Sequence, residues 1–72
     1  MIKVTYTYSF DELSGKPKRF LESKTDCKIL GYGVSMDTVT LSVLYETNES
    51  FVRLNNELKT KFKLKPKQIK TV

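Results

Sequence analysis

The chain has 72 residues, a formal net charge of +5, no histidine and a single cysteine, Cys27. This length corresponds to one domain with a small core, and a lone cysteine rules out an internal disulfide. No apolar run approaches the roughly 20 residues that a membrane-spanning helix needs, and the N-terminus lacks the apolar stretch of a signal peptide. We therefore expect a cytoplasmic protein without a membrane span.

The first predicted element is a strand over residues 2–10, where apolar and polar residues alternate strictly. A period of two with β-branched and aromatic residues is typical of a strand that buries one face. The other face should then be polar and carry little charge. Its small polar residues are Thr5, Thr7 and Ser9.

Residues 11–26 allow two interpretations. Ser14-Gly15 is a turn signal, and Pro17 suits the first position of a helix, where a missing backbone N–H costs little. One interpretation is a helix of two turns around residues 17–24. The alternative is an ordered loop, because isolated short helices are marginal without packing.

Residues 27–35 are predicted to form a second strand, although Gly31 and Gly33 interrupt it. A glycine inside a strand indicates either a bulge or a place where another molecule approaches the backbone closely. We prefer the bulge, which would turn Ile29 inward. A hairpin turn should then lead into the next strand.

The third predicted strand, residues 37–46, has the most regular alternation after that of the first. Its apolar residues are Val39, Leu41, Val43 and Tyr45, and its small polar residues are Thr38, Thr40 and Ser42. This pattern again indicates one buried face and one polar face. If the first strand pairs with this one, the third strand lies in the centre of the sheet and the strand order is 2-3-1.

The period changes to that of a helix over residues 48–63. Its apolar stripe consists of Phe51, Leu54, Leu58 and Phe62, at spacings of three and four. We expect Asn48 to cap the start and Arg53 to pair with Glu57 on the solvent side. Pro66 should limit the helix.

The elements predict an α+β domain over residues 1–65, with a basic C-terminal tail over residues 66–72. The domain would hold a three-stranded antiparallel sheet with the C-terminal helix packed on one face, and a short helix between the first two strands under one interpretation. The tail could alternatively add a short edge strand. The predicted core consists of Val4, Tyr6, Tyr8, Phe10, Leu30, Tyr32, Val34, Val39, Leu41, Val43, Tyr45, Phe51, Leu54, Leu58 and Phe62.

The side chains available for acid–base chemistry argue against an enzyme. The absence of histidine removes the commonest general base and the commonest zinc ligand. The chain also lacks a phosphate-cradling glycine loop and a nucleophile elbow. For Cys27, an inert buried thiol is the preferred interpretation, since no cationic partner is predictable. We expect no catalytic residues, no metal and no cofactor.

The basic excess lies at one end of the chain. Residues 58–72 contain six lysines and no acidic residue, whereas residues 1–57 have a net charge of −1. Such an excess indicates an anionic partner, either nucleic acid or a protein with an acidic surface, unless the charge serves only solubility. The leading hypothesis is a small nucleic-acid-binding module without strong sequence specificity. Its candidate phosphate contacts are Lys59, Lys61, Lys63, Lys65, Lys67, Lys70 and Arg53.

The alternative hypothesis is a protein-binding regulator or inhibitor. Its interface would be the polar sheet face, formed by Thr5, Thr7, Ser9, Thr38, Thr40 and Ser42, or an open edge of the sheet. A small sheet leaves two edges unpaired, and strand addition by a partner or a second copy is a common use of such edges. A homodimer through a sheet edge belongs to this alternative.

Overall fold

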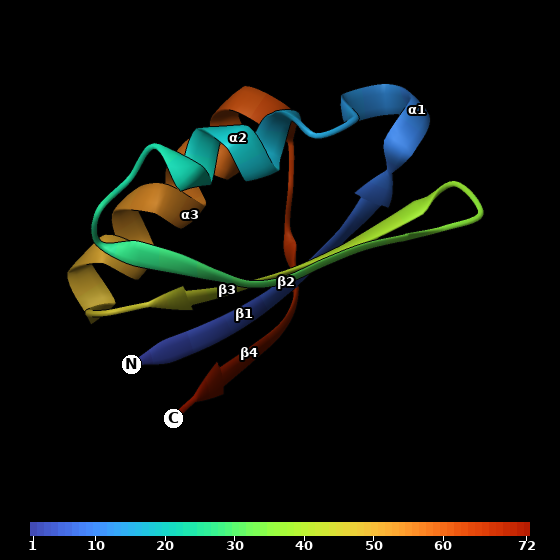
Figure 1. Cartoon of the computed structure of the whole chain (residues 1–72). Helices are drawn as coiled ribbons and strands as arrows, with labels where there is room; N and C mark the ends of the chain where they lie inside the picture. The colour runs from blue at the N-terminus through green and yellow to red at the C-terminus, as the bar shows by residue number, and fades with distance from the viewer.

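The computed structural model describes residues 1–72 and shows an α+β arrangement, with three helices on one face of an antiparallel sheet (Figure 1). The elements in chain order are β1 (Ile2–Ser9), α1 (Phe10–Leu13), α2 (Lys16–Glu22), β2 (Cys27–Ser35), β3 (Thr38–Tyr45), α3 (Asn48–Phe62) and β4 (Pro66–Thr71). The strand order is β2-β3-β1-β4. Two interlocked β-α-β units with this order make a split, ferredoxin-like topology.

The sheet has four strands, so the prediction of three strands is wrong. Residues Pro66–Thr71, expected as a tail, pair antiparallel with β1 as the edge strand β4, which was the alternative left open for this segment. Pro66 begins the strand, where a residue without an N–H is tolerated. Pairing of β4 with β1 is regular from Ile2 to Thr5 and shifts in register before Tyr6. The last paired residue of β1 is Tyr6, opposite Pro66, so β4 does not extend beside Thr7, Tyr8 and Ser9.

The first three strands and the long helix form where the alternation and the helical period placed them. α2 settles the ambiguity between a helix and a loop, with Gly15 at its N-cap and Pro17 in its first turn. The bulge in β2 is confirmed, because the register against β3 shifts between Ile29 and Gly31. This shift lets Ile29 pack against the core, as expected.

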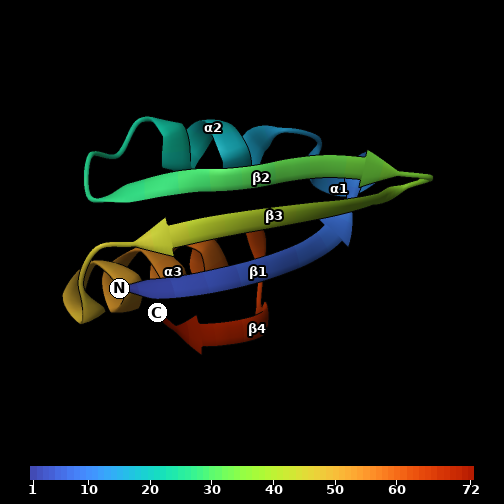
Figure 2. The same cartoon turned by 60° about the horizontal axis from the view of Figure 1, so that its bottom comes forward.

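The core lies between the helices and one face of the sheet. Its buried apolar residues are Ile2, Val4, Tyr6, Leu21, Val39, Leu41, Val43, Tyr45, Leu54, Leu58 and Leu64. Three predicted core residues, Phe10, Leu30 and Val34, are instead 38–47% exposed. Leu30 stands at the bulge, and Val34 lies on the β2–β3 hairpin, which extends beyond the helices (Figures 1 and 2).

The ends of α3 differ in detail from the prediction. Thr47, not Asn48, is the N-cap, because Thr47 and Ser50 form a reciprocal capping box. Lys63 ends the helix in the left-handed conformation at φ 57°. Arg53 pairs with Asp26, in the turn before β2, and not with Glu57.

A chain of hydrogen bonds joins the sheet to α3 inside the core. The Tyr6 hydroxyl donates to Asn55 Oδ1 at 2.9 Å, so the Tyr45 hydroxyl, 2.7 Å away, must donate to the Tyr6 oxygen. Burial raises the pKa of Tyr6 to about 12, and the hydrogen bond with Tyr45 partly opposes that rise. Burial and the same hydrogen bond raise the pKa of Tyr45. Both phenols therefore stay neutral at physiological pH.

Candidate nucleic-acid interface

The lysines of segment 58–72 are fixed on the folded domain at four kinds of position. Lys59 and Lys61 lie in the last turn of α3, and Lys63 is its C-cap. Lys65 lies in the connection to β4, whereas Lys67 and Lys70 belong to β4 itself. All six are exposed, and none forms an ion pair. The fold therefore presents six free positive charges but does not gather them on one face.

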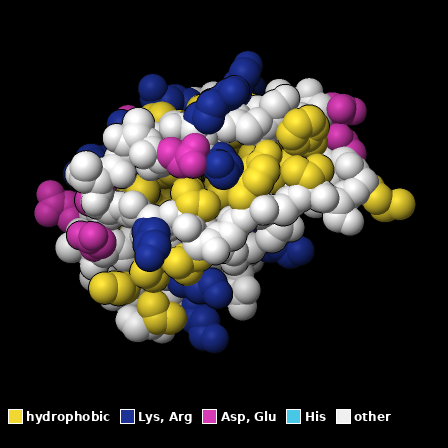
Figure 3. Space-filling view, in the orientation of Figure 1, with side chains coloured by type: hydrophobic (Ala, Val, Ile, Leu, Met, Phe, Trp, Pro, Cys, Tyr) yellow, Lys and Arg dark blue, Asp and Glu magenta, His cyan; other side chains and the backbone are white.

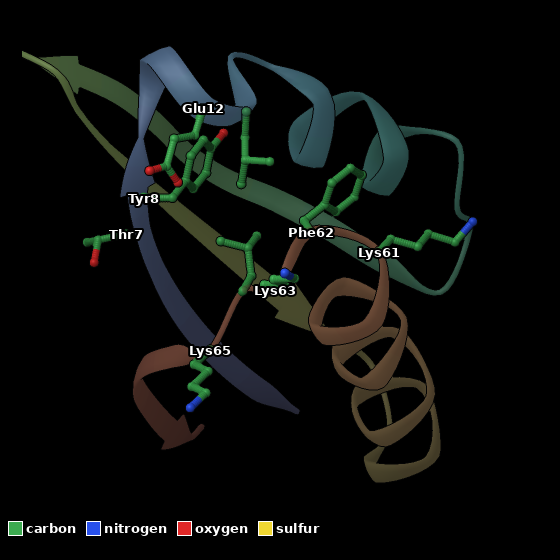
Figure 4. A pocket seen from close by; sticks show the side chains of 9 residues that line it. Thr7, Tyr8, Glu12, Lys61, Phe62, Lys63 and Lys65 are labelled. Atoms are coloured by element: carbon green, nitrogen blue, oxygen red, sulfur yellow. The ribbon is translucent and has the colours of Figure 1, made fainter.

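A pocket of about 530 Å³ lies beside the end of α3 (Figure 4). β4 pairs with β1 only as far as Tyr6, so the β1 edge from Thr7 onward, next to α1, has no strand neighbour on this side. The residues that line it are Thr7, Tyr8, Glu12, Leu13, Lys61, Phe62, Lys63, Leu64 and Lys65. Four of these nine residues are apolar or aromatic, and three are lysines.

The lysines of this pocket do not converge on a common point. Figure 4 shows the Lys61 side chain pointing away toward the α2 side and the Lys65 side chain pointing to the opposite side. The Lys61 amine lies 5.3 Å from the centre of the Phe20 ring on α2, in a cation–π contact. An anion in the pocket would therefore meet scattered charges, so we do not assign the pocket a ligand.

The tyrosine in the pocket wall has a structural role. The Tyr8 hydroxyl donates to the backbone oxygen of Ser14 at 2.9 Å and so holds the turn between α1 and α2. Burial, together with a smaller contribution from the neighbouring Tyr32, raises the pKa of Tyr8 to about 12. A phenol held neutral in this way is a poor general base at physiological pH.

The second candidate surface is the sheet face that no helix covers, which we call the open face (Figure 2). The strand register assigns to it Lys3, Thr5, Thr7, Ser9, Lys28, Gly31, Gly33, Ser35, Thr38, Thr40, Ser42, Leu44, Gln68 and Lys70. All six residues proposed for a protein interface lie on it together. None of the strand residues on this face is acidic or aromatic, and the four tyrosines point to the helix side. At the hairpin end of the face, the Asp37 carboxylate accepts a hydrogen bond from the Ser9 hydroxyl.

A row of basic residues crosses one end of the open face. Leu44 of β3 is the register partner of Lys3 on β1 and of Lys28 on β2, and Lys3 is also the partner of Lys70 on β4. We call Lys3, Lys28 and Lys70 the basic row. Only Lys70 belongs to the segment that the sequence pointed to. The other two were missed because the register that joins them links residues far apart in the chain.

The remaining candidates have local explanations. Arg53 is bound to Asp26, so its charge is compensated. Burial, followed by the nearby Asp26 carboxylate, raises the pKa of Cys27, and its thiol donates to the Leu21 carbonyl at 3.6 Å. This Cys27 environment favours the neutral thiol over the reactive thiolate.

The structure contains neither a metal-binding cluster nor a membrane-spanning helix. No cluster of three or more His, Cys, Asp or Glu residues is placed to hold a metal ion. No helix has both the length and the apolar character needed to cross a membrane.

The fold and surface thus define a small α+β domain with a split β-α-β topology, one open sheet face and an uncompensated basic end. Comparison of the chain with protein-family models, curated proteins and solved structures finds no match. Its function must therefore be argued from its own surface.

Proposed function

We propose that the protein binds nucleic acid without catalysis and without strong sequence specificity. The observation that carries this proposal is the state of the six lysines of segment 58–72. All are exposed, none is paired with an acid, and β4 fixes two of them on the sheet. Figure 3 shows Lys and Arg side chains gathered near β4, at the lower end of the view, with no acidic side chain among them.

Lysines of this kind suit contacts with phosphates. Each contact releases a condensed counterion, so the logarithm of the binding constant falls linearly with the logarithm of the salt concentration. Each contact contributes about 0.9 to the magnitude of this slope for a duplex and about 0.7 for a single strand. Base readout favours Arg, Asn and Gln on a presented element. Because Arg53 is engaged by Asp26, the proposal relies on the lysines alone and predicts little preference among sequences.

The test is a salt titration of binding to a mixed-sequence oligonucleotide. A variant with Lys61, Lys63, Lys65 and Lys67 changed to Gln should bind more weakly, with a slope smaller by about three units. The control carries the same loss of charge on the helix side, with Lys16, Lys18, Arg19 and Lys24 changed to Gln, and should keep most of the slope. Absence of binding by the unchanged protein at low salt would overturn the proposal.

A protein partner is the second candidate, and β2 is the feature that favours it. This nine-residue strand has a neighbour on one side only, and it exposes Leu30 and Val34 by nearly half. An open edge with exposed apolar residues can accept an added strand, including one from a second copy. If a dimer forms this way, Leu30→Lys should shift the protein from dimer to monomer in sedimentation. A wild-type monomer at high concentration would exclude the homodimer.

A further inference from the structure

The basic row contains the only charged residues that the register places on the open face. Lys28, Lys3 and Lys70 are on β2, β1 and β4, and the first two flank the half-buried Leu44 of β3. Neighbouring strands lie about 4.8 Å apart, so the row spans about 14 Å, the full width of the sheet. All three lysines are exposed and lack an ion-pair partner.

The row is electrostatically unfavourable in the free protein. Lys3 and Lys70 are direct register partners on adjacent strands, and like charges in such positions destabilise a sheet. Neither lysine has an ion-pair partner, so no acidic side chain in contact with them offsets this cost. A bound anion that lies along the row would supply that compensation.

The residues next to the basic row include three hydrogen-bond donors and one glycine. The neighbouring row consists of Gly31, Ser42, Thr5 and Gln68. The hydroxyls and the amide can donate to phosphate oxygens, and Gly31 adds no side chain that would keep a ligand away. A Cβ at Gly33, one row further, would meet nothing within 4 Å.

The chemistry of this face selects among anionic partners. A membrane surface calls for exposed apolar residues that enter the lipid, and a protein partner calls for aromatic or arginine anchors. Leu44 is the only apolar residue that the register places on the open face, it is half-buried, and no aromatic or arginine residue accompanies it. The open face also lacks the sheet aromatics on which bases stack in several single-strand-binding modules. Its charges and donors match a phosphate backbone.

We infer that the phosphate backbone of a single-stranded nucleic acid lies along the basic row, across the strands, with its bases directed away from the sheet. The inference rests on the proposed function and adds Lys3 and Lys28 to its contacts. It places the ligand on the open face, whereas Lys59 and Lys61 lie on α3. A sheet four strands wide does not enter a duplex groove that is about 12 Å wide, so single strands should bind better than duplexes.

The experiment compares two triple variants of the full chain in salt titrations with a mixed-sequence single-stranded DNA. One changes Lys3, Lys28 and Lys70 to Gln. The other changes Lys16, Arg19 and Lys24 to Gln, which removes the same charge from the helix side. We expect the first variant to lose about two units of salt slope and the second to lose far less. Circular dichroism confirms that each variant is folded.

A second pair of variants adds one negative charge to either side of the sheet. Thr40→Glu lies on the open face, two rows from the basic row, and Asn56→Glu lies on the exposed side of α3. Only Thr40→Glu should weaken binding markedly. Anionic phospholipid vesicles serve as the comparison ligand and should not bind better than the oligonucleotide.

The outcomes separate the inference from the proposed function. Equal losses in the two triple variants, or binding to vesicles and not to the oligonucleotide, would overturn the inference. Loss only in the variant of Lys61, Lys63, Lys65 and Lys67 would also overturn it while leaving nucleic-acid binding intact. Failure of the unchanged protein to bind any oligonucleotide at low salt would instead overturn the proposed function.

Discussion

The same four strands form both faces of the sheet, but the two faces differ in character. One face is apolar and buried, and the other is polar and exposed. On the covered face, Val4, Leu41 and Val43 have no exposed surface, and the helices contribute Leu54 and Leu58 to the same core. No helix covers the open face (Figure 2), and the register places small polar residues and lysines on it. Because side chains alternate along a strand, each strand supplies both surfaces at once.

This difference separates stability from binding. A covered position is constrained by volume, since the close-packed core penalises any change of shape. A side chain on the open face contacts only its neighbours on the adjacent strands. A charged residue that binds a ligand can therefore occupy such a position at small cost to the free energy of folding. Substitutions on the covered face should therefore change the free energy of unfolding more than substitutions on the open face.

The largest contrast is expected between two adjacent residues of β3. Leu41 is fully buried on the covered face, whereas Thr40 is exposed on the open face. Leu41→Ala should lower the free energy of unfolding by about 2–5 kcal/mol, because it removes buried methyl groups and leaves a cavity. Thr40→Ala should change it by about 0.5 kcal/mol or less. Urea denaturation measures both, and similar losses would mean that Thr40 is buried in solution.

The next effect concerns the polar group inside the covered face. Tyr6→Phe removes the hydroxyl that links Tyr45 to Asn55. It leaves the buried Tyr45 hydroxyl and the partly buried Asn55 amide each short of a hydrogen bond. The free energy of unfolding should fall by about 1–3 kcal/mol. Tyr45→Phe should cost less, because Tyr6 still donates to Asn55 in that variant. The opposite order of the two variants in urea denaturation would contradict the assigned donor directions.

The same two phenols should make the protein sensitive to alkali. The pKa of Tyr6 is raised from 10.0 to about 12, so the folded state retains a proton that the unfolded state loses near pH 10. The free energy of unfolding is therefore unaffected well below pH 10 and falls as pH rises from 10 toward about 12. Denaturation midpoints across that range provide the measurement. Tyr6→Phe should show a shallower decline, and an equal decline would assign the effect to other groups.

Much of the covered face could be predicted from the sequence, because burial leaves a periodic pattern. The bounds of β1, β2, β3 and α3 follow from that pattern to within a residue or two. β4 was only an alternative, since its sequence is polar and its pairing relies on backbone hydrogen bonds. The exposure of Leu30 and Val34 depends on a bulge and on how far the helices extend, which periodicity does not report.

The candidate site was only partly predictable, for a related physical reason. The lysines of segment 58–72 are visible in composition, but their directions depend on where α3 ends and on how β4 pairs. Lys28 and Lys70 lie in one row only because the register pairs Lys28 with Leu44, Leu44 with Lys3, and Lys3 with Lys70. Contacts between residues so far apart in the chain come from topology, and a single sequence carries no local signal for them.

At the tip of the β2–β3 hairpin, beyond the helices, a further change should increase stability. Met36 has φ 58°, a left-handed conformation that disfavours residues with a Cβ, and its side chain is fully exposed. Met36→Gly should therefore raise the free energy of unfolding by about 1 kcal/mol, with no loss of packing. Thermal unfolding tests this prediction. A lower melting temperature would show that the Met36 side chain makes contacts in solution.

The smallest expected effect is on the open face and has opposite signs for folding and binding. Lys70→Gln removes the repulsion from Lys3 and should raise the free energy of unfolding by about 0.2–1 kcal/mol at low salt. The gain should shrink as salt screens the two charges. In a background that already carries Lys3→Gln, the same change should have no stabilising effect, since the repulsive partner is gone. If Lys70→Gln also weakens oligonucleotide binding, the Lys70 charge destabilises the fold but strengthens binding, which is the result expected for a residue that serves the ligand. A gain that persists in the Lys3→Gln background would instead trace the effect to strand propensity at residue 70.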